Sequence, residues 1–421
     1  MGSRHELRGG DWTTRGEDDA WGKGKVNPDF IKPRYDEGGF AGIPDRIKTA
    51  FASDKYDAVV LFLVDAFGWR FYERFQDSPF IKRIAKHGRI EKLISQFPST
   101  TAAHLTTIHT GWNVGQSGVH EWIYYEPQLD AIIAPLLFSF AGSQYREDLK
   151  STGIHPPLLY PRGVFYPELK KMGVNSHVFG IRDYTPSTYS NAVMAGADLH
   201  SFKTLSEALV NLGLLLEKET TPAYIYLYFD KIDMLCHEYG PTAPQTEAEI
   251  ETFLLMMEYY FERIFKGKGK KRTLFLMTAD HGASEVDPKT TVYLNTEPRF
   301  VGFEKFIKTN RRGKLLVPAG SARDMFLYIK ESMLDDAQSF VAKRLEGKAD
   351  VVKTESLIND GYFGAEVSSR FRERAGNLVI LPFRYESVWW YEKDKFEQKF
   401  YGHHGGLTPQ EMETVLYSYE V

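Results

Sequence analysis

Cysteine is almost absent from this chain, because Cys236 is the single cysteine among 421 residues. One cysteine cannot form an intrachain disulfide, so a disulfide-stapled fold is excluded and a reducing compartment is favoured. We therefore expect the protein to be cytoplasmic. An exported protein without disulfides, from which a leader has been removed, is the alternative.

Long apolar runs and an excess of one charge are also missing. The opening 24 residues hold no apolar signal-peptide core, and no later stretch supplies the roughly 20 apolar residues that a membrane span needs. The formal net charge is only −4, so no overall basic field attracts nucleic acid or an anionic membrane. The sequence carries no signal for either partner and none for an oligomeric state.

Apolar and aromatic residues are plentiful, with 43% hydrophobic residues that include 29 Phe and 24 Tyr. This is enough to build a large core. From Ile43 onward, short apolar runs alternate with helical periods, which predicts an α/β fold with a largely parallel central sheet flanked by helices. Residues 1–40 lack such a pattern and are expected to form a mobile or strap-like arm before a catalytic domain at 41–421.

Strand and helix signals between about 290 and 400 predict an inserted subdomain beside the main sheet. Elsewhere, helical periods predict helices at 205–217 and 102–110. Thr246 and Glu249 have the spacing of a capping box and so predict the start of a further helix. The basic run at 263–272 is interpreted as a solvated loop.

Four apolar runs are predicted to be buried strands, and three of them lead directly into acidic residues. Asp65 follows the run at 58–64, Asp233 lies just after the run at 223–229, and Asp280 follows the run at 274–279. The fourth run, 177–181, carries no ligand. Open α/β sheets bind ligands outside the carboxyl ends of their strands, so these acidic residues are expected to converge.

Several of these residues have the chemistry of metal ligands. Asp280 and His281 are two adjacent ligand types, and the following Gly282 permits close backbone approach. Asp233 and His237 are four residues apart, which places both side chains on one face of a helical turn. For each residue alone, helix capping by the aspartate or a buried, hydrogen-bonded histidine is an alternative.

The segment Pro-Ser-Thr-Thr at 98–101 places hydroxyl groups before the helix predicted at 102–110. A hydroxyl at a helix N-terminus meets free backbone N–H groups and the positive end of the dipole, both of which favour a bound phosphate. Ordinary N-capping by Ser99 or Thr100 is the alternative. Thr101 becomes a candidate nucleophile only in combination with the metal ligands.

Together these motifs resemble the alkaline phosphatase superfamily, and within it the type I phosphodiesterase/nucleotide pyrophosphatase family, over residues 28–421. The resemblance implies a three-layer sandwich with two Zn²⁺ ions, for which Mn²⁺ or Co²⁺ are alternatives. It also implies that Thr101 is the nucleophile and forms a covalent phosphothreonine. The implied metal ligands are Asp65, Thr101, Asp280 and His281 for one ion, and Asp233, His237 and His404 for the other.

Two positions depart from that pattern or leave it open. Family members commonly carry an oxyanion-binding Asn three residues after the nucleophile, where this chain has His104. His104 is therefore a substrate-binding candidate, with simple packing as the alternative. His403 precedes His404 and can exchange roles with it, although the histidine directly before Gly-Gly is the better match.

The predicted activity is metal-dependent hydrolysis of phosphodiester or pyrophosphate bonds in a small phosphodiester, nucleotide or pyrophosphate substrate. No arginine is recognisable near the nucleophile, and this favours diesters slightly over monoesters. The alternatives are a phosphomonoesterase or a phosphomutase of the same superfamily, and a catalytically silent binding scaffold. A sulfatase is excluded, because Cys236 lacks the required sequence context.

Overall fold

The computed structural model describes residues 26–265 and 272–421. The greater part of the basic run at 263–272, which we interpreted as a solvated loop, lies outside the described residues. The described arm, residues 26–40, forms a strap against the rest of the chain. Its backbone amides at Asn27 and Ile31 donate to Asp350 Oδ2 (2.6 Å) and to the Leu407 carbonyl (2.8 Å).

A seven-stranded sheet forms the centre of the molecule. Six strands are mutually parallel, and only the C-terminal strand runs against its two neighbours. The prediction of a largely parallel sheet is therefore confirmed. In spatial order the strands are β2 (Arg89–Ile94), β17 (Glu413–Glu420), β9 (Thr273–Thr278), β1 (Ala58–Val64), β8 (Ala223–Phe229), β6 (Asn175–Ile181) and β7 (Asp198–Phe202).

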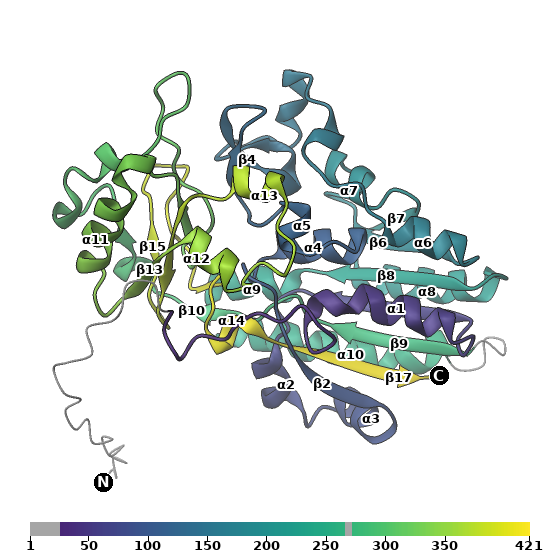
Figure 1. The fold of residues 1–421 in the computed structure, drawn as a ribbon. Coiled ribbons are helices and arrows are strands. Elements are labelled where there is room, and N and C mark those ends of the chain that lie inside the picture. Colours follow the sequence, from purple (N-terminus) through teal and green to yellow (C-terminus); the bar gives the residue numbers. More distant parts are fainter. Residues whose placement is uncertain (1–25, 266–271) are drawn as a thin grey trace, which may run out of the picture.

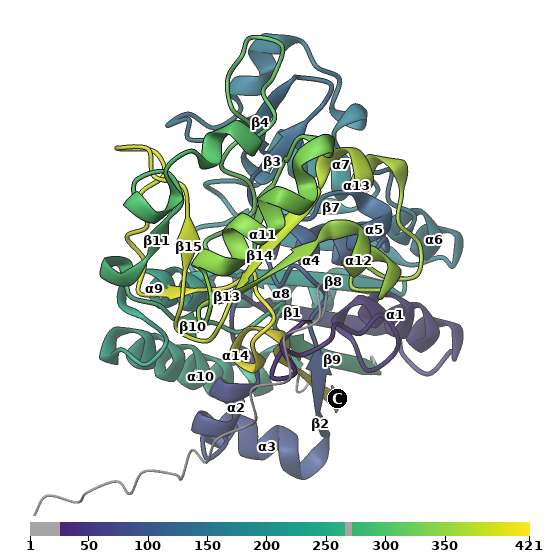
Figure 2. The ribbon, with the colours of Figure 1, turned by 60° about the vertical axis from the view of Figure 1, so that its left-hand side comes forward.

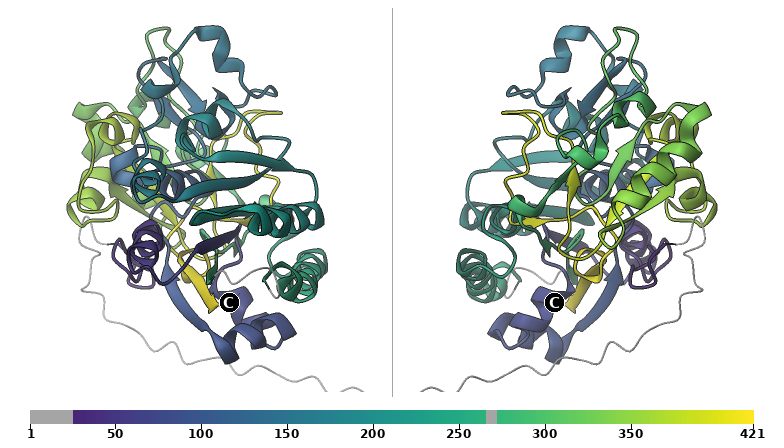
Figure 3. Two further views of the ribbon diagram at one scale, coloured as in Figure 1. Left: turned by 90° about the vertical axis from the view of Figure 1, so that its right-hand side faces the viewer. Right: turned by 90° about the vertical axis from the view of Figure 1, so that its left-hand side faces the viewer.

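Helices cover both faces of this sheet and make the predicted three-layer sandwich (Figure 3). This is why every residue of β1 and β8 is buried. One face carries α1 (Ile43–Ala52), α4 (Thr101–Thr110), α6 (Phe165–Lys171) and α7 (Thr188–Val193), and the other carries α2 (Trp69–Phe75), α3 (Pro79–His87), α8 (Leu205–Lys218) and α10 (Pro244–Phe265). No helix in the described ranges is both long enough and apolar enough to cross a bilayer.

The capping box predicted at Thr246 is wrong, because α10 begins two residues earlier, at Pro244. The Thr246 hydroxyl lies inside the first turn of α10 and donates to the Gly240 carbonyl at 2.9 Å. It therefore ties α10 to the end of α9 (Lys231–Tyr239), the short helix that follows β8.

A smaller subdomain lies beyond the carboxyl ends of the parallel strands (Figure 1). It is built on the antiparallel sheet β12 (Met325–Leu327), β14 (Leu378–Pro382) and β13 (Ala349–Lys353). Helix α11 (Leu334–Arg344) packs on β13 and lies across this sheet in Figure 2. Two hydrophobic clusters, separate from that of the main sheet, form its interior.

The sequence did not predict a third sheet, which is made of β3 (Tyr124–Glu126), β4 (Ala131–Ala134) and β5 (Ser139–Phe140). These strands are only two to four residues long. The segment around them supplies Trp122, Leu136 and Leu137 to cavities at the carboxyl edge of the main sheet. It thereby shapes the region where the acidic residues converge.

Candidate active site

Three buried side chains meet where β1 and β9 end. Asp65 follows β1, and Asp280 and His281 follow β9, the parallel neighbour of β1. Each offers one ligand atom, and these atoms lie within 4.8 Å of one another. The convergence follows from topology, because adjacent parallel strands deliver their last residues to the same edge.

A second group forms beside the first. Asp233 and His237 lie one turn apart on α9, and His404 joins them from the Gly-rich loop near the C-terminus; their ligand atoms also lie within 4.8 Å of one another. The short strands β10 (Ser284–Glu285) and β16 (Gly402–His403) pair and bring that loop to the end of β9. The rings of His404 and His281 stack with centroids 3.7 Å apart, so the two groups are contiguous. His404, rather than His403, belongs to the group.

Thr101 lies at the first position of α4, next to the first group. Its Oγ1 is 3.2 Å from His281 Nε2 and 3.5 Å from Asp65 Oδ2. The alternative of ordinary capping is not observed, since the Thr100 side chain makes no capping bond and the Ser99 hydroxyl donates to the Gly406 carbonyl. The structure thus brings together all seven residues that the sequence singled out.

The three imidazoles share one hydrogen-bonding pattern. Nδ1 faces a backbone carbonyl in each: Gly402 for His237 (2.9 Å), Gly282 for His281 (3.0 Å) and Ser99 for His404 (3.0 Å). Because a carbonyl can only accept, Nδ1 carries the proton in each neutral ring. Every Nε2 therefore presents a lone pair toward the carboxylates, and this is the orientation in which histidine binds a metal.

The carboxylates of the site also have lone pairs that accept no hydrogen bond within the described chain. Asp65 Oδ1, Asp233 Oδ1 and Asp280 Oδ2 are buried and accept no hydrogen bond from any residue that the structure describes. With the imidazoles neutral, these nitrogens and oxygens are acceptors that face acceptors, which leaves charge and several lone pairs uncompensated. Carboxylate oxygen and imidazole nitrogen are ligands that divalent metal ions accept, so the donor set fits metal ions.

The pKa values of the carboxyl groups also reflect the uncompensated negative charge at the site. Burial raises the pKa of Asp65 well above its usual range, and the charges of Asp280 and Asp233 raise it further. Burial likewise raises the pKa of Asp280. For Asp233, burial acts in the same direction, but the imidazoles of His237, His404 and His281 together outweigh it and hold the pKa low. A bound cation would favour the ionised form of all three carboxylates.

Tyr228 supports the site and was missed by the sequence analysis. Its buried hydroxyl donates to Asp65 Oδ2, which fixes the carboxylate and leaves Oδ1 without a hydrogen bond from the described part of the chain. Contacts of this kind orient metal ligands. The only sequence signal is the alternation of Tyr224, Tyr226 and Tyr228 on one face of β8, which gives no hint of the Asp65 contact.

His104 does not reach the space around Thr101. It is fully buried beneath the first turn of α4, with Nδ1 2.7 Å from the Thr100 carbonyl and Nε2 2.7 Å from the Ser95 hydroxyl. Burial lowers its pKa to about 3, so the ring is neutral. Both nitrogens are used within the protein, so the position of His104 does not support its predicted contact with a phosphoryl oxygen. It holds the peptide that precedes the candidate nucleophile.

Thr101 lines two cavities. One, of about 220 Å³, runs along α4 and β8, and the other, of about 470 Å³, extends toward the subdomain. Thr101, Trp122, Leu137 and Asp233 line both. Arg146 lines the smaller cavity with its guanidinium 5.3 Å from the Tyr184 ring centroid, so an arginine that the sequence analysis did not identify shares a cavity with Thr101.

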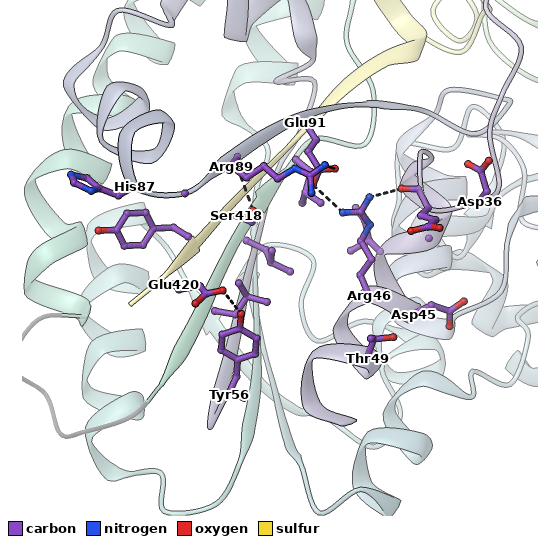
Figure 4. A pocket seen from close by; sticks show the side chains of 18 of the residues that line it. Asp36, Asp45, Arg46, Thr49, Tyr56, His87, Arg89, Glu91, Ser418 and Glu420 are labelled. Atoms are coloured by element: carbon purple, nitrogen blue, oxygen red, sulfur yellow. Dashed lines mark hydrogen bonds and ion pairs between the residues drawn. The ribbon is translucent and has the colours of Figure 1, made fainter. Parts of the chain in front are cut away.

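A larger cavity, of about 740 Å³, lies at the opposite end of the sheet, between α1 and the strands β2 and β17 (Figure 4). Most of its charged side chains form ion pairs. Arg46 forms an ion pair with Glu91 (3.1 Å), and Glu420 accepts from the Tyr56 hydroxyl (2.7 Å). It contains none of the seven residues of the candidate site.

Comparison with known protein families gives one match over most of the chain. The model of the family "Type I phosphodiesterase / nucleotide pyrophosphatase" matches residues 59–407, an interval that includes all seven residues. A search of curated protein sequences found no significant match.

Solved structures with the same fold include two enzymes of different names. Murine ectonucleotide pyrophosphatase/phosphodiesterase 5 is 14% identical, with a TM-score of 0.64 over 86% of this chain and 87% of its own. Its inactive threonine-to-alanine variant, in complex with AMP, has a TM-score of 0.63 at the same identity and coverage. Phosphonoacetate hydrolase from Sinorhizobium meliloti 1021, in complex with phosphonoacetate, is 16% identical with a TM-score of 0.57, over 86% of this chain and 90% of its own.

Proposed function

The chain belongs to the type I phosphodiesterase/nucleotide pyrophosphatase family and is a hydrolase of that type, and we propose that it cleaves phosphodiester or pyrophosphate bonds with Thr101 as the nucleophile. Two Zn²⁺ ions are the proposed cofactors, with Mn²⁺ or Co²⁺ as alternatives. Asp65, Thr101, Asp280 and His281 would hold one ion. Asp233, His237 and His404 would hold the other.

The observation that carries this proposal is the place of Thr101 at the junction of two cavities. A diester or a pyrophosphate has a substituent on each side of the reacting phosphorus, and each substituent needs room. A simple monoester has one organic group and would leave one cavity empty. This geometry supports a diester independently of any argument from arginine, since Arg146 lines the same cavity as Thr101.

The metal ions, when bound, supply positive charge that lowers the pKa of a coordinated hydroxyl and stabilises charge on the attacking and leaving oxygens. The protein itself positions the nucleophile. Thr101 begins a ten-residue helix, whose dipole favours an anion at that end. Its hydroxyl points at His281 and Asp65, so it is placed to bind the ion that these two residues would hold, and its proton would pass to water.

The reaction then has two displacements at phosphorus. Thr101 Oγ1 forms a bond to phosphorus while the bond to the leaving oxygen breaks, and that oxygen departs with the electron pair. Water next forms a bond to the same phosphorus, and the bond to Oγ1 breaks, which regenerates the hydroxyl. The inactive murine variant, in which a threonine is replaced by alanine, supports an essential threonine in this fold.

A monoesterase remains the second candidate, and Arg146 is the observation that favours it. Arg146 makes no ion pair with a carboxylate of the described chain and lines the cavity beside Thr101. Its guanidinium can pair with the additional negative charge of a monoester. An Arg146→Ala variant that loses p-nitrophenyl phosphate turnover but keeps diester turnover would assign Arg146 to that role.

Hydrolysis of three chromogenic substrates tests the proposal: bis-p-nitrophenyl phosphate, a p-nitrophenyl nucleotide ester and p-nitrophenyl phosphate. Each is assayed with metal-stripped and with zinc-reloaded protein. We expect zinc to restore cleavage of the first two compounds. Preference for p-nitrophenyl phosphate would favour the monoesterase, and no turnover of any substrate with zinc bound would favour a mutase or a silent scaffold.

A further inference from the structure

The loop that carries His404 is held from three directions. From the segment before the candidate nucleophile, the Ser99 hydroxyl donates to the Gly406 carbonyl (2.8 Å). From the subdomain, the Ser321 hydroxyl lies 3.1 Å from the His404 carbonyl. The third contact is made by Glu411, which is fully buried. The position of His404 therefore depends on parts of the chain that are far apart in the sequence.

The Glu411 carboxylate fixes the backbone that follows His404. Glu411 lies in the short helix α14 (Pro409–Met412). Its carboxylate accepts from the backbone N–H groups of Gly406 (3.0 Å) and Thr408 (3.3 Å), and from the Thr408 hydroxyl (2.5 Å). Gly406 is only two residues after His404, so the loop cannot move relative to Glu411 without breaking these hydrogen bonds.

The main chain of Glu411 reaches the other metal group. Its carbonyl accepts from the Gly282 N–H at 2.9 Å. Gly282 directly follows His281, and its own carbonyl is 3.0 Å from His281 Nδ1. Glu411 is therefore connected to both groups, to His404 through its carboxylate and to His281 through its carbonyl. Only the connection to His404 depends on the side chain of Glu411.

Arg323 holds the Glu411 carboxylate in place. It lies two residues before β12 of the subdomain and is fully buried. Its Nε and Nη2 donate to the two oxygens of Glu411 at 2.9 and 2.8 Å, which is the bidentate arrangement that fixes both groups in one orientation. Its Nη1 donates to the carbonyls of Phe383 and Glu386, which follow β14. The guanidinium thus links the Glu411 carboxylate to two strands of the subdomain sheet.

This ion pair is not needed to fill the space that it occupies. Removing two charges from water offsets much of their attraction, so an apolar pair of similar volume is often equally stable. An apolar side chain at position 411, however, has no oxygen to accept from Gly406 and Thr408. The specific contribution of the pair is therefore the geometry of the loop that carries His404.

We propose that Arg323 and Glu411 are positioning residues for the metal group of Asp233, His237 and His404: the docked subdomain holds Glu411, and Glu411 holds the loop that presents His404 Nε2. The proposal rests on the proposed function, because it takes this group as a metal site. Neither Arg323 nor Glu411 lines one of the three cavities described above, so both act through the loop rather than on substrate.

The chain offers a matched control. Arg374 and Glu126 form a second arginine–glutamate pair that is almost completely buried, with Arg374 Nε donating to Glu126 Oε2 at 2.8 Å. The other donors of Arg374 reach the carbonyls of Gly118 (3.0 Å) and Leu159 (2.9 Å). None of its hydrogen bonds within the described chain reaches either metal group. Loss of this pair therefore reports the general effect of removing a buried ion pair.

Two double variants test the proposal. Arg323→Met with Glu411→Met is compared with Arg374→Met with Glu126→Met, and each replaces an ion pair by apolar side chains, a change that proteins often tolerate. The number and affinity of bound zinc ions are measured by competition with a chromophoric chelator. Absorption spectra of the Co²⁺-loaded proteins compare the geometry of the ligands, and thermal unfolding checks folding.

We expect the variant at Arg323 and Glu411 to bind one of its two zinc ions about 10–100-fold more weakly, with a changed Co²⁺ spectrum. The control should bind both ions as the wild type does, even where its Tm falls equally. If either double variant fails to fold, Arg323→Lys and Arg374→Lys form a second matched pair. Lysine keeps the charge but not the two parallel hydrogen bonds, so only Arg323→Lys should weaken zinc binding.

Two results would overturn the proposal: equal zinc affinities in the two matched variants, or fewer than two ions bound by the wild-type protein. Failure of the proposed function is a different outcome. In that case the wild type binds two ions without hydrolysing bis-p-nitrophenyl phosphate, and the difference in zinc affinity between the variants persists. Diester hydrolysis with equal zinc affinities in both variants would leave the proposed function intact and reject the positioning role.

Discussion

The two ends of the central sheet differ in how their polar atoms are used. At the amino end of β1, the larger cavity is lined by charged groups that are largely paired, as Arg46 is with Glu91. At the carboxyl end, Asp65, Asp233 and Asp280 each keep a buried oxygen that accepts no hydrogen bond from the described residues. Buried carboxylate oxygens without a described partner therefore mark the candidate-site end of this sheet, because the unpaired buried atom at the larger cavity is a guanidinium nitrogen, Arg46 Nε.

The largest effect is expected from Thr101→Ala. Loss of the nucleophile should lower kcat for bis-p-nitrophenyl phosphate by about 10³-fold or more. Metal content should fall little, because three other side chains of its group remain. Steady-state kinetics and elemental analysis measure the two quantities. Retained turnover with metal bound would show that Thr101 is not the nucleophile.

Asp233→Asn should come next, because it removes a charge from the group that includes His237 and His404. We expect metal affinity to drop by at least about 10–100-fold, with activity restored only at high zinc concentration. Competition against a chelator measures the affinity. Unchanged affinity would show that this group holds no ion.

A smaller effect is expected from Tyr228→Phe, which removes the hydroxyl that donates to Asp65. Activity at limiting zinc should fall by about tenfold and recover as zinc is added, because the carboxylate loses its orienting contact. Tyr417→Phe is a suitable control, since Tyr417 is another buried tyrosine of the sheet and lines none of the three cavities described above. If activity depends on zinc concentration equally in the two variants, Tyr228 does not orient Asp65.

Arg46→Ala should have the smallest effect. It breaks the ion pair with Glu91 at the opposite end of the sheet, where both side chains are partly exposed. Such pairs contribute about 1 kcal/mol or less to the free energy of unfolding. Denaturant unfolding should show that small loss, and diester hydrolysis should be unchanged. A large loss of activity would mean that the two ends of the sheet are not functionally distinct.

The carboxyl end was largely predictable from the sequence, because its residues follow buried strands. The bounds of β1 and β8 agree with the predicted runs, since strands buried on both faces are continuously apolar and end where Asp65 and Asp230 begin. The aspartates converge because parallel strands end at one edge, whereas Thr101 arrives from α4 and His404 from the loop after β16. Their roles remain proposals.

The cavity walls were not predictable. Strands β3 to β5 are too short to show periodicity and are defined by pairing with one another. The position of Arg146 depends on that segment and on Tyr184, which lies far away in the sequence. Likewise, the buried Tyr226 hydroxyl is recognised as lacking a partner among the described residues only when α4 is packed against β8. Sequence spacing locates ligands at strand ends, but it does not show which hydroxyl groups lack a partner.

The most direct test of the central claim is mass spectrometry of zinc-loaded protein quenched in acid during turnover of bis-p-nitrophenyl phosphate. The account predicts a p-nitrophenyl phosphoryl adduct on the peptide that contains Thr101, and no adduct in metal-stripped protein. Steady turnover without any adduct on that peptide, together with full activity of Thr101→Ala, would contradict it.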